Sequence, residues 1–186
     1  LEQLEMLNST FDGTVPQGTI RPRGYYHILN TEREAYQDYA QTPPASSLTT
    51  TAEDFSHFLL MLINEGNYRG RQMLKPKTVR TMFLPRYKFS PALPGYACAW
   101  EENYIKGKRV FQHSGLTWGF SSVCIVIPEE KFGFFASVNS DKSEPIWELA
   151  NNLISRFTIP KKSPRKIRAK TFNVAPEVYK QITGFY

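Results

Sequence analysis

The sequence predicts a mixed α/β fold of the α+β kind, an antiparallel β-sheet meander flanked by helices. The first observation behind this prediction is a set of short apolar runs that are rich in Val, Ile, Phe, Tyr, Trp and Cys, the residues that suit a pleated, half-buried surface. There are four such runs: Tyr96–Tyr104, Arg109–His113, Gly119–Ile127 and Phe132–Val138. The second observation is that helical patterns precede and follow them, so helices should cover the sheet.

Charged turns connect the runs in pairs. Lys106-Gly107-Lys108 separates the first two runs, and Pro128-Glu129-Glu130-Lys131 separates the last two. Glycine supplies a positive φ without steric cost and the charged side chains stay in water, so both segments predict hairpin connections.

Three helices are expected around this meander. Residues 50–66 have Thr50 followed by Glu53, which is a capping-box pattern, and Gly66 at the end. Their apolar residues recur at steps of three and four: Ala52, Phe55, Phe58, Leu59, Leu62 and Ile63. A second helix should begin at Pro76 and end near Phe83. A third should follow Ser143, with apolar residues at helical spacing from Ile146 to Phe157.

Composition limits the possible partners. The chain has 186 residues, enough for a good core, and a net charge of +6. Residues 161–170 contain six Lys or Arg and no acid, so the rest of the chain is balanced. We therefore expect no nucleic-acid partner, although a binding module whose basic segment contacts nucleic acid or anionic lipid is an alternative. No apolar run approaches the length needed to span a membrane.

The cysteine and histidine pattern predicts neither a disulfide nor a metal. Cys98 and Cys124 fall on the first and third predicted strands, and the second strand should separate them. No paired Cys/His spacing typical of a metal site is present, so we expect no metal and no cofactor.

A polar break in the meander is the strongest chemical signal. His113-Ser114-Gly115 lies at the predicted end of a strand and is followed by Trp118-Gly119-Phe120-Ser121-Ser122. This segment resembles the H-[ST]-G-x-x-x-G-[FY]-x-S strand of the serine β-lactamase and penicillin-binding-protein superfamily. It is most similar to the branch of class C β-lactamases, D-aminopeptidases and esterases, in which His replaces the Lys of K-T-G.

Other segments match the same superfamily in its order along the chain. Residues 4–11 resemble its LGMxxTxF segment, Arg23-Gly24-Tyr25 its A-x-GY, and Thr50–Phe58 its STAxDLxxF helix. Pro44–Leu48 resembles PAGGL, with serines in place of both glycines. The resemblance implies a partial β-lactamase/transpeptidase-like fold over 1–158, a basic linker over 159–173, and the start of a truncated C-terminal β domain over 174–186.

The resemblance also implies acyl-serine chemistry whose nucleophile is missing from these residues. The superfamily uses a serine with a lysine three residues later, which precede the LGM segment, and a Y-x-N or S-x-N turn. The only S-x-x-K in the chain is Ser163-Pro164-Arg165-Lys166 in the basic run, and the only S-x-N is Ser137-Val138-Asn139 at the end of a core strand. We therefore expect the C-terminal half of a serine hydrolase that acts on a small-molecule or peptide acyl substrate, with the N-terminal half of the domain as its partner. Family resemblance suggests a periplasmic or extracellular location.

Roles transfer residue by residue to the matching strand. His113 would shape the electrostatics beside the nucleophile, and Ser114 would hydrogen-bond the substrate carboxylate or carbonyl. Gly115 would keep the strand open to the acyl group, and Leu116 would donate its backbone N–H to the oxyanion. Trp118 and Tyr25 would line the substrate cleft. The alternatives are a catalytically inactive homologue and a binding module of the same fold, and the residues do not distinguish β-lactam, D-amino-acid peptide and ester substrates.

Overall fold

The structure is a computed structural model, and part of the chain lies outside its described residues. It describes residues 1–15, 18, 20–29, 31–36, 42, 45–90 and 93–158. The predicted linker 159–173 and the predicted β segment 174–186 lie outside the described residues, as does Ser163.

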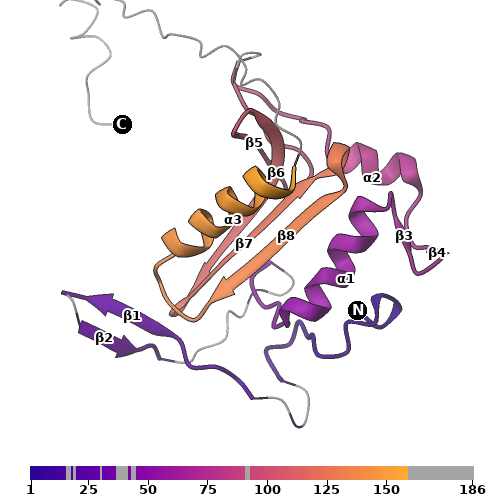
Figure 1. Cartoon of the computed structure of the whole chain (residues 1–186). Helices are drawn as coiled ribbons and strands as arrows, with labels where there is room; N and C mark the ends of the chain where they lie inside the picture. Colours follow the sequence, from indigo (N-terminus) through magenta and orange to yellow (C-terminus); the bar gives the residue numbers. More distant parts are fainter. Residues whose placement is uncertain are drawn as a thin grey trace, which may run out of the picture.

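A four-stranded antiparallel sheet in the order β5-β6-β7-β8 forms the centre of the molecule, which confirms the predicted meander (Figure 1). Its strands are β5 (Glu101–Ile105), β6 (Lys108–Thr117), β7 (Phe120–Ile127) and β8 (Phe132–Val138). The two-residue turn Lys106-Gly107 has positive φ at both positions and joins β5 to β6, as a type I′ hairpin requires. The first strand is shorter than predicted, because residues 96–100 form a loop, and Cys98 lies there as a free, exposed thiol.

Helices cover both faces of this sheet, and each face has its own core. Helix α3 (Glu144–Phe157) packs on β7 and β8 over a cluster that includes Val110, Val123 and Ile125. On the opposite face α1 (Ala52–Ile63) and α2 (Pro76–Met82) enclose Phe111 and further apolar residues. Figure 1 shows α3 on one side of the sheet and α1 and α2 on the other.

The N-cap of α1 is one residue later than predicted. The hydroxyl of Thr51, not that of Thr50, accepts a hydrogen bond from the Asp54 N–H at 3.1 Å, so the predicted capping box is wrong. Asp54 is itself buried and accepts hydrogen bonds of 2.7 Å from the Asn8 N–H and the Ser9 hydroxyl. These bonds attach the N-terminal segment to α1, which explains why Thr50 does not cap the helix: its hydroxyl bonds Ser9 Oγ at 2.7 Å.

Smaller elements surround this core. They are the 3₁₀ turns η1 (Glu2–Leu4) and η2 (Pro128–Glu130), the hairpin of β1 (Tyr25–Ile28) and β2 (Thr31–Glu34), and the short pair β3 (Asn67–Tyr68) and β4 (Arg71–Gln72). The β1–β2 hairpin was not predicted. It extends from the end of the sheet where β6 turns into β7, and a parallel bridge between Tyr25 and Ser140 connects it to the chain after β8 (Figure 1).

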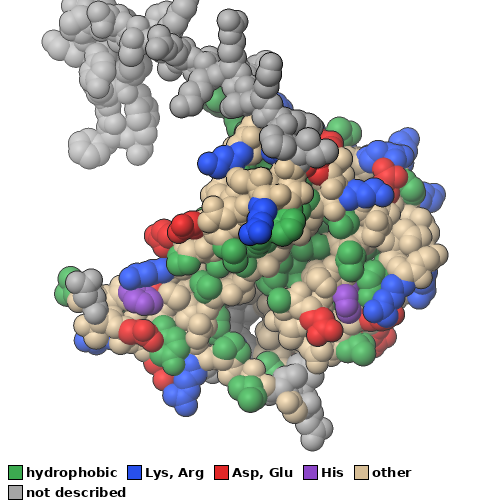
Figure 2. Space-filling view, viewed as in Figure 1, with side chains coloured by type: hydrophobic (Ala, Val, Ile, Leu, Met, Phe, Trp, Pro, Cys, Tyr) green, Lys and Arg blue, Asp and Glu red, His purple; other side chains and the backbone are tan. Residues whose placement is uncertain are grey.

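Side-chain types are mixed on the surface in view. Figure 2 shows hydrophobic side chains gathered in the middle of this face, beside α3, with acidic and basic side chains around them. Within the described residues, no helix has both the length and the apolar character needed to cross a bilayer.

Candidate functional site

The His-Ser-Gly segment lies inside a strand, not at its end. Strand β6 continues through Thr117, and β7 pairs with it along its whole second half. On the other side the partner strand β5 stops earlier, because its last pair is Glu101 with Gln112. Among the described residues nothing pairs with the outer edge of β6 from His113 to Thr117, and these five residues are exposed. We call this segment the free edge.

The alternation of an antiparallel ladder determines which main-chain groups point outward along the free edge. Ile105 and Lys108 flank a two-residue turn, so their N–H and C=O groups point toward each other. Even-numbered residues of β6 therefore direct these groups toward β5, and beyond Gln112 they direct them into open space. Ser114 and Leu116 are the two residues whose main-chain donors and acceptors face outward. Thr117 and Phe120 flank the next two-residue turn, so the main-chain groups of Thr117 point toward β7. Odd-numbered residues of β6 therefore face β7, which agrees with the outward direction of Ser114 and Leu116.

The side chains of the free edge divide between the two faces of the sheet. Phe111 belongs to the core under α1, so His113 and Gly115 lie on that face by alternation, and Ser114 and Leu116 lie on the α3 face. Neither helix covers this end of β6. Leu116 is 74% exposed, and a Cβ on Gly115 would lie 2.6 Å from Ser122 Oγ on the adjacent strand. The glycine thus allows Ser122 to approach the strand closely.

The thiol opposite the histidine is not a nucleophile. Cys124 pairs with His113 across the β6–β7 ladder and is only 6% exposed. Burial raises the pKa of the Cys124 thiol to about 12, so the thiol stays protonated near neutral pH. Cys124 is therefore not a candidate nucleophile beside His113.

Two glycines bring the predicted cleft residues Trp118 and Tyr25 next to each other in the backbone. The Tyr25 N–H donates to the Gly119 carbonyl at 3.2 Å, and Gly119 has φ +69°. A Cβ on Gly24 would lie 2.7 Å from the Trp118 carbonyl oxygen, so only glycine permits this contact. Trp118 is 54% exposed and Tyr25 is half-buried, both at the end of the free edge.

A second group of polar side chains anchors the β1–β2 hairpin. His27 Nδ1 lies 2.9 Å from Asp141 Oδ1 and 3.3 Å from Ser140 Oγ. The hydrogen bond with His27 lowers the pKa of Asp141 below its ordinary value. Because serine and aspartate meet the same ring nitrogen, the group lacks the serine–imidazole–carboxylate order of a catalytic triad.

The remaining sequence candidates for the chemistry lie elsewhere. Ser137 donates to the Ser121 carbonyl at 3.3 Å, and Asn139 donates its amide to the Arg23 carbonyl at 2.9 Å, so both serve the packing of the sheet end. No group of His, Cys, Asp and Glu suited to a metal ion occurs among the described residues.

Comparison with known proteins places this geometry in a family. The profile of the family described as Beta-lactamase matches residues 1–157, which is most of the chain. The chain belongs to the Beta-lactamase family. A curated relative, "Beta-lactamase-like protein 1" of Dictyostelium discoideum, is 25% identical over 179 residues, covering 86% of this chain and 28% of that protein.

Solved structures share the fold of this Beta-lactamase family chain. The octameric penicillin-binding protein homologue from Pyrococcus abyssi has a TM-score of 0.68 at 20% identity, over 87% of this chain and 37% of that one. The D-stereospecific amidohydrolase from Streptomyces sp. has a TM-score of 0.60 at 18% identity, over 79% and 44%. The chain thus spans less than half the length of each of these proteins. The family and the fold support a serine-hydrolase type of domain.

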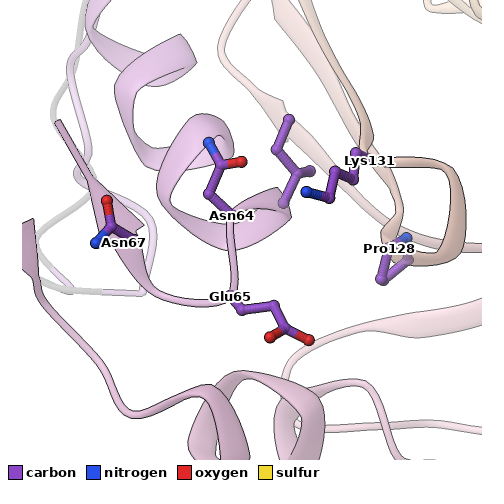
Figure 3. A pocket seen from close by; sticks show the side chains of 6 residues that line it. Asn64, Glu65, Asn67, Pro128 and Lys131 are labelled. Atoms are coloured by element: carbon purple, nitrogen blue, oxygen red, sulfur yellow. The ribbon is translucent and has the colours of Figure 1, made fainter. Parts of the chain in front are cut away.

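One pocket of the Beta-lactamase domain lies away from the free edge. It has a volume of about 520 Å³ and is lined by Ile63, Asn64, Glu65, Asn67, Pro128 and Lys131. Figure 3 shows these side chains between the end of α1 and the turn after β7. That turn is at the opposite end of the sheet from the β6–β7 turn, and Glu65 is paired there with Arg80 at 2.8 Å. We do not assign the chemistry to this pocket.

A smaller cavity, which sequence reasoning missed, has Gln112, the residue just before the free edge, in its lining. It has a volume of about 250 Å³, and Glu101 and Gln112 line it where the β5–β6 pairing ends. The sequence carries no motif at these positions, since a Glu and a Gln eleven residues apart match no known spacing of functional residues. Only the register of the hairpin, which is set by the turn at Lys106-Gly107, could have indicated that they meet.

Proposed function

We propose that this chain contributes one wall of the acyl-transfer site of a serine hydrolase of the β-lactamase and penicillin-binding-protein type. The observation that carries the proposal is the free edge of β6, which is exposed and unpaired within the described residues at the position of the His-Ser-Gly motif. An extended acyl substrate can add to such an edge as a further strand, because main-chain hydrogen bonds supply the binding.

The outward main-chain groups give this wall its chemistry. In the proposed complex the Leu116 N–H donates to the carbonyl oxygen of the scissile bond and then to the oxyanion that forms on attack. The Ser114 hydroxyl and main chain bind the adjacent carbonyl or carboxylate of the substrate. His113 is exposed on the α1 face, where its imidazole can hydrogen-bond the nucleophile or the leaving group. Gly115 leaves the space between them free of side-chain atoms.

The attacking serine comes, in this proposal, from a segment that these 186 residues do not include. The chain covers 28% of its curated relative, and its only S-x-x-K sequence lies outside the described residues. A helix carrying the serine and its lysine would pack against the open α1 face beside His113. Trp118 and Tyr25 would border the cleft at its far end. The substrate class is an amide or ester of a small acyl group: a β-lactam, a D-amino-acid peptide or an ester.

A fluorescent penicillin and a fluorophosphonate probe test this function. We expect both to label the complete protein covalently on a serine upstream of Leu1, and to leave the 186-residue chain unlabelled. Mass mapping of the labelled peptide identifies the nucleophile. Labelling of the isolated chain would show that the nucleophile is misplaced. A complete protein that no acyl probe labels would instead be an inactive homologue or a binding module with the same fold.

A further inference from the structure

The charged residues that line the smaller cavity are both acidic, so the cavity favours a cationic ligand. It lies where β5 ends against β6, and its polar lining comes from Glu101, Glu102, Asn103 and Gln112. No lysine or arginine lines it. Gln112 is the lining residue that belongs to β6, and it directly precedes His113, the first residue of the free edge.

One of the two carboxylates in the cavity is already neutralised. Glu102 is 4% exposed and forms ion pairs with Lys88 Nζ at 2.6 Å and Arg109 Nε at 2.7 Å. The Gly95 N–H also donates to it at 2.9 Å. Burial alone would raise the pKa of Glu102, but the hydrogen bonds from Lys88 and Arg109 outweigh burial and leave that pKa below its usual value. Glu102 is thus a fully partnered structural anion.

Glu101 is the carboxylate that lacks a cation. Among the described residues no ion pair to Glu101 is formed. The Gln112 amide donates to Glu101 Oε2 at 3.3 Å, and the Asn103 amide donates to Gln112 Oε1 at 3.3 Å. Gln112 is itself 8% exposed, so this amide chain has a fixed place in the sheet. These amides orient the Glu101 carboxylate, but they supply no positive charge to pair with it.

We propose that this cavity binds a protonated primary amine of the substrate. The assignment to a substrate rests on the proposed function, whereas the binding of an amine does not. The ammonium group donates to Glu101 and completes the ion pair that the protein leaves open. The same charge repels a free carboxylate at this end of the cleft. The preferred substrates are therefore acyl compounds that carry an amino group next to the segment paired with Ser114, and not compounds that end there in a carboxylate.

Binding of small probes to the 186-residue chain tests the cavity without any catalysis. The probes are alaninamide, which is cationic at pH 7, N-acetylalaninamide, which is neutral, and N-acetylalanine, which is anionic. In ¹H–¹⁵N NMR titrations at low salt we expect alaninamide to shift the side-chain amide signals of Asn103 and Gln112. The two acetylated probes should bind at least about threefold more weakly, the factor expected when one solvent-accessible ion pair is lost.

Two variants complete the test. Glu101→Gln keeps the size of the side chain and its contact with Gln112, and should reduce alaninamide binding to the level of the acetylated probes. Glu148→Gln, an exposed change on α3, should leave binding as in the parent chain. Thermal melts confirm that both variants fold. Equal shifts from all three probes, unchanged binding in Glu101→Gln, or no shift at Asn103 and Gln112 with alaninamide would each overturn the proposal.

A second measurement relates the cavity to the substrate. In the complete protein we expect Glu101→Gln to raise KM about threefold or more for an amino-terminated ester and to leave KM for its N-acetyl counterpart unchanged, with kcat little altered for both. If amines bind to the isolated chain but no acyl probe labels the complete protein, the proposed function is wrong and the proposal that the cavity binds an amine still holds. If acyl probes label the protein but KM does not distinguish the two esters, the cavity is not part of the substrate site.

Discussion

Proline substitution at two neighbouring residues of β6 tests the assignment of the free edge directly. Proline has no N–H, so it removes one hydrogen-bond donor from the strand. By alternation the Leu116 N–H points into open space, while the Thr117 N–H points to Phe120 on β7. Leu116→Pro and Thr117→Pro therefore remove donors that point in opposite directions from adjacent positions.

The expected difference in stability follows from what each N–H contacts. Thr117→Pro removes a ladder hydrogen bond and leaves the Phe120 carbonyl without its partner, which costs about 1–2 kcal/mol. For a domain of this size that corresponds to a fall in Tm of roughly 2–8 °C. Leu116→Pro removes no ladder bond, and the leucine side chain is 74% exposed, so we expect a change within about 0.5 kcal/mol.

Thermal and urea denaturation of the two variants measure this difference in the chain itself. In the complete protein, Leu116→Pro should also lower kcat/KM by about 10²–10³, because it deletes the proposed oxyanion donor. If Leu116→Pro destabilises the chain as much as Thr117→Pro does, the Leu116 N–H belongs to a ladder. The free edge and the oxyanion assignment would then both be wrong.

Two further predictions concern the surroundings of the site. Glu102→Gln should destabilise the chain by about 1–3 kcal/mol at pH 7, since Lys88 and Arg109, each about one-third exposed, lose the anion that they share. Arg109 keeps only its longer contact with Glu129, at 3.8 Å. The pKa of Glu102 is lower in the folded than in the unfolded chain, so the stabilisation that its charge provides is fully present above the ordinary pKa of 4.5. This stabilisation is lost as the pH falls through the folded pKa. Urea melts of the parent chain and the variant should therefore converge at low pH. Gly119→Ala should be more damaging than Gly70→Ala: both glycines have positive φ, but a Cβ on Gly119 would lie 2.5 Å from Tyr25 N and one on Gly70 would meet nothing within 4 Å. Equal Tm values for the two alanine variants would contradict the tight contact at the β6–β7 turn.

Much of the sheet could be predicted from the sequence, because its strands are apolar and its turns are charged. The cores on both faces depend on this pattern, and so do α2, which begins at Pro76 as expected, and α3. The start of α1 could be predicted only to within one residue. Both Thr50 and Thr51 can cap a helix, and the bond from Thr50 to Ser9, 41 positions away, decides between them.

The features that shape the candidate site were harder to predict. Strand β2, Thr31–Glu34, is polar and exposed at every position, so no alternation marks it as a strand. The continuation of β6 beyond His113 was hidden by Gly115, which normally weakens a strand and here makes room for Ser122. The free edge itself depends on where β5 stops, which is a property of pairing between strands. The motif indicates which residues we expect to matter, but it carries no information on which side of the strand is open.

An edge that can receive one extended chain can also receive another. Natural sheets usually protect such edges with lysine, proline or a bulge, and the outer side of β6 from 113 to 117 has the sequence His-Ser-Gly-Leu-Thr, without a lysine or a proline. When the 186-residue chain is concentrated alone, two copies can therefore pair along this strand, and oligomers should accumulate as the concentration rises. A segment or ligand that pairs with the free edge in the complete protein would also prevent this self-association.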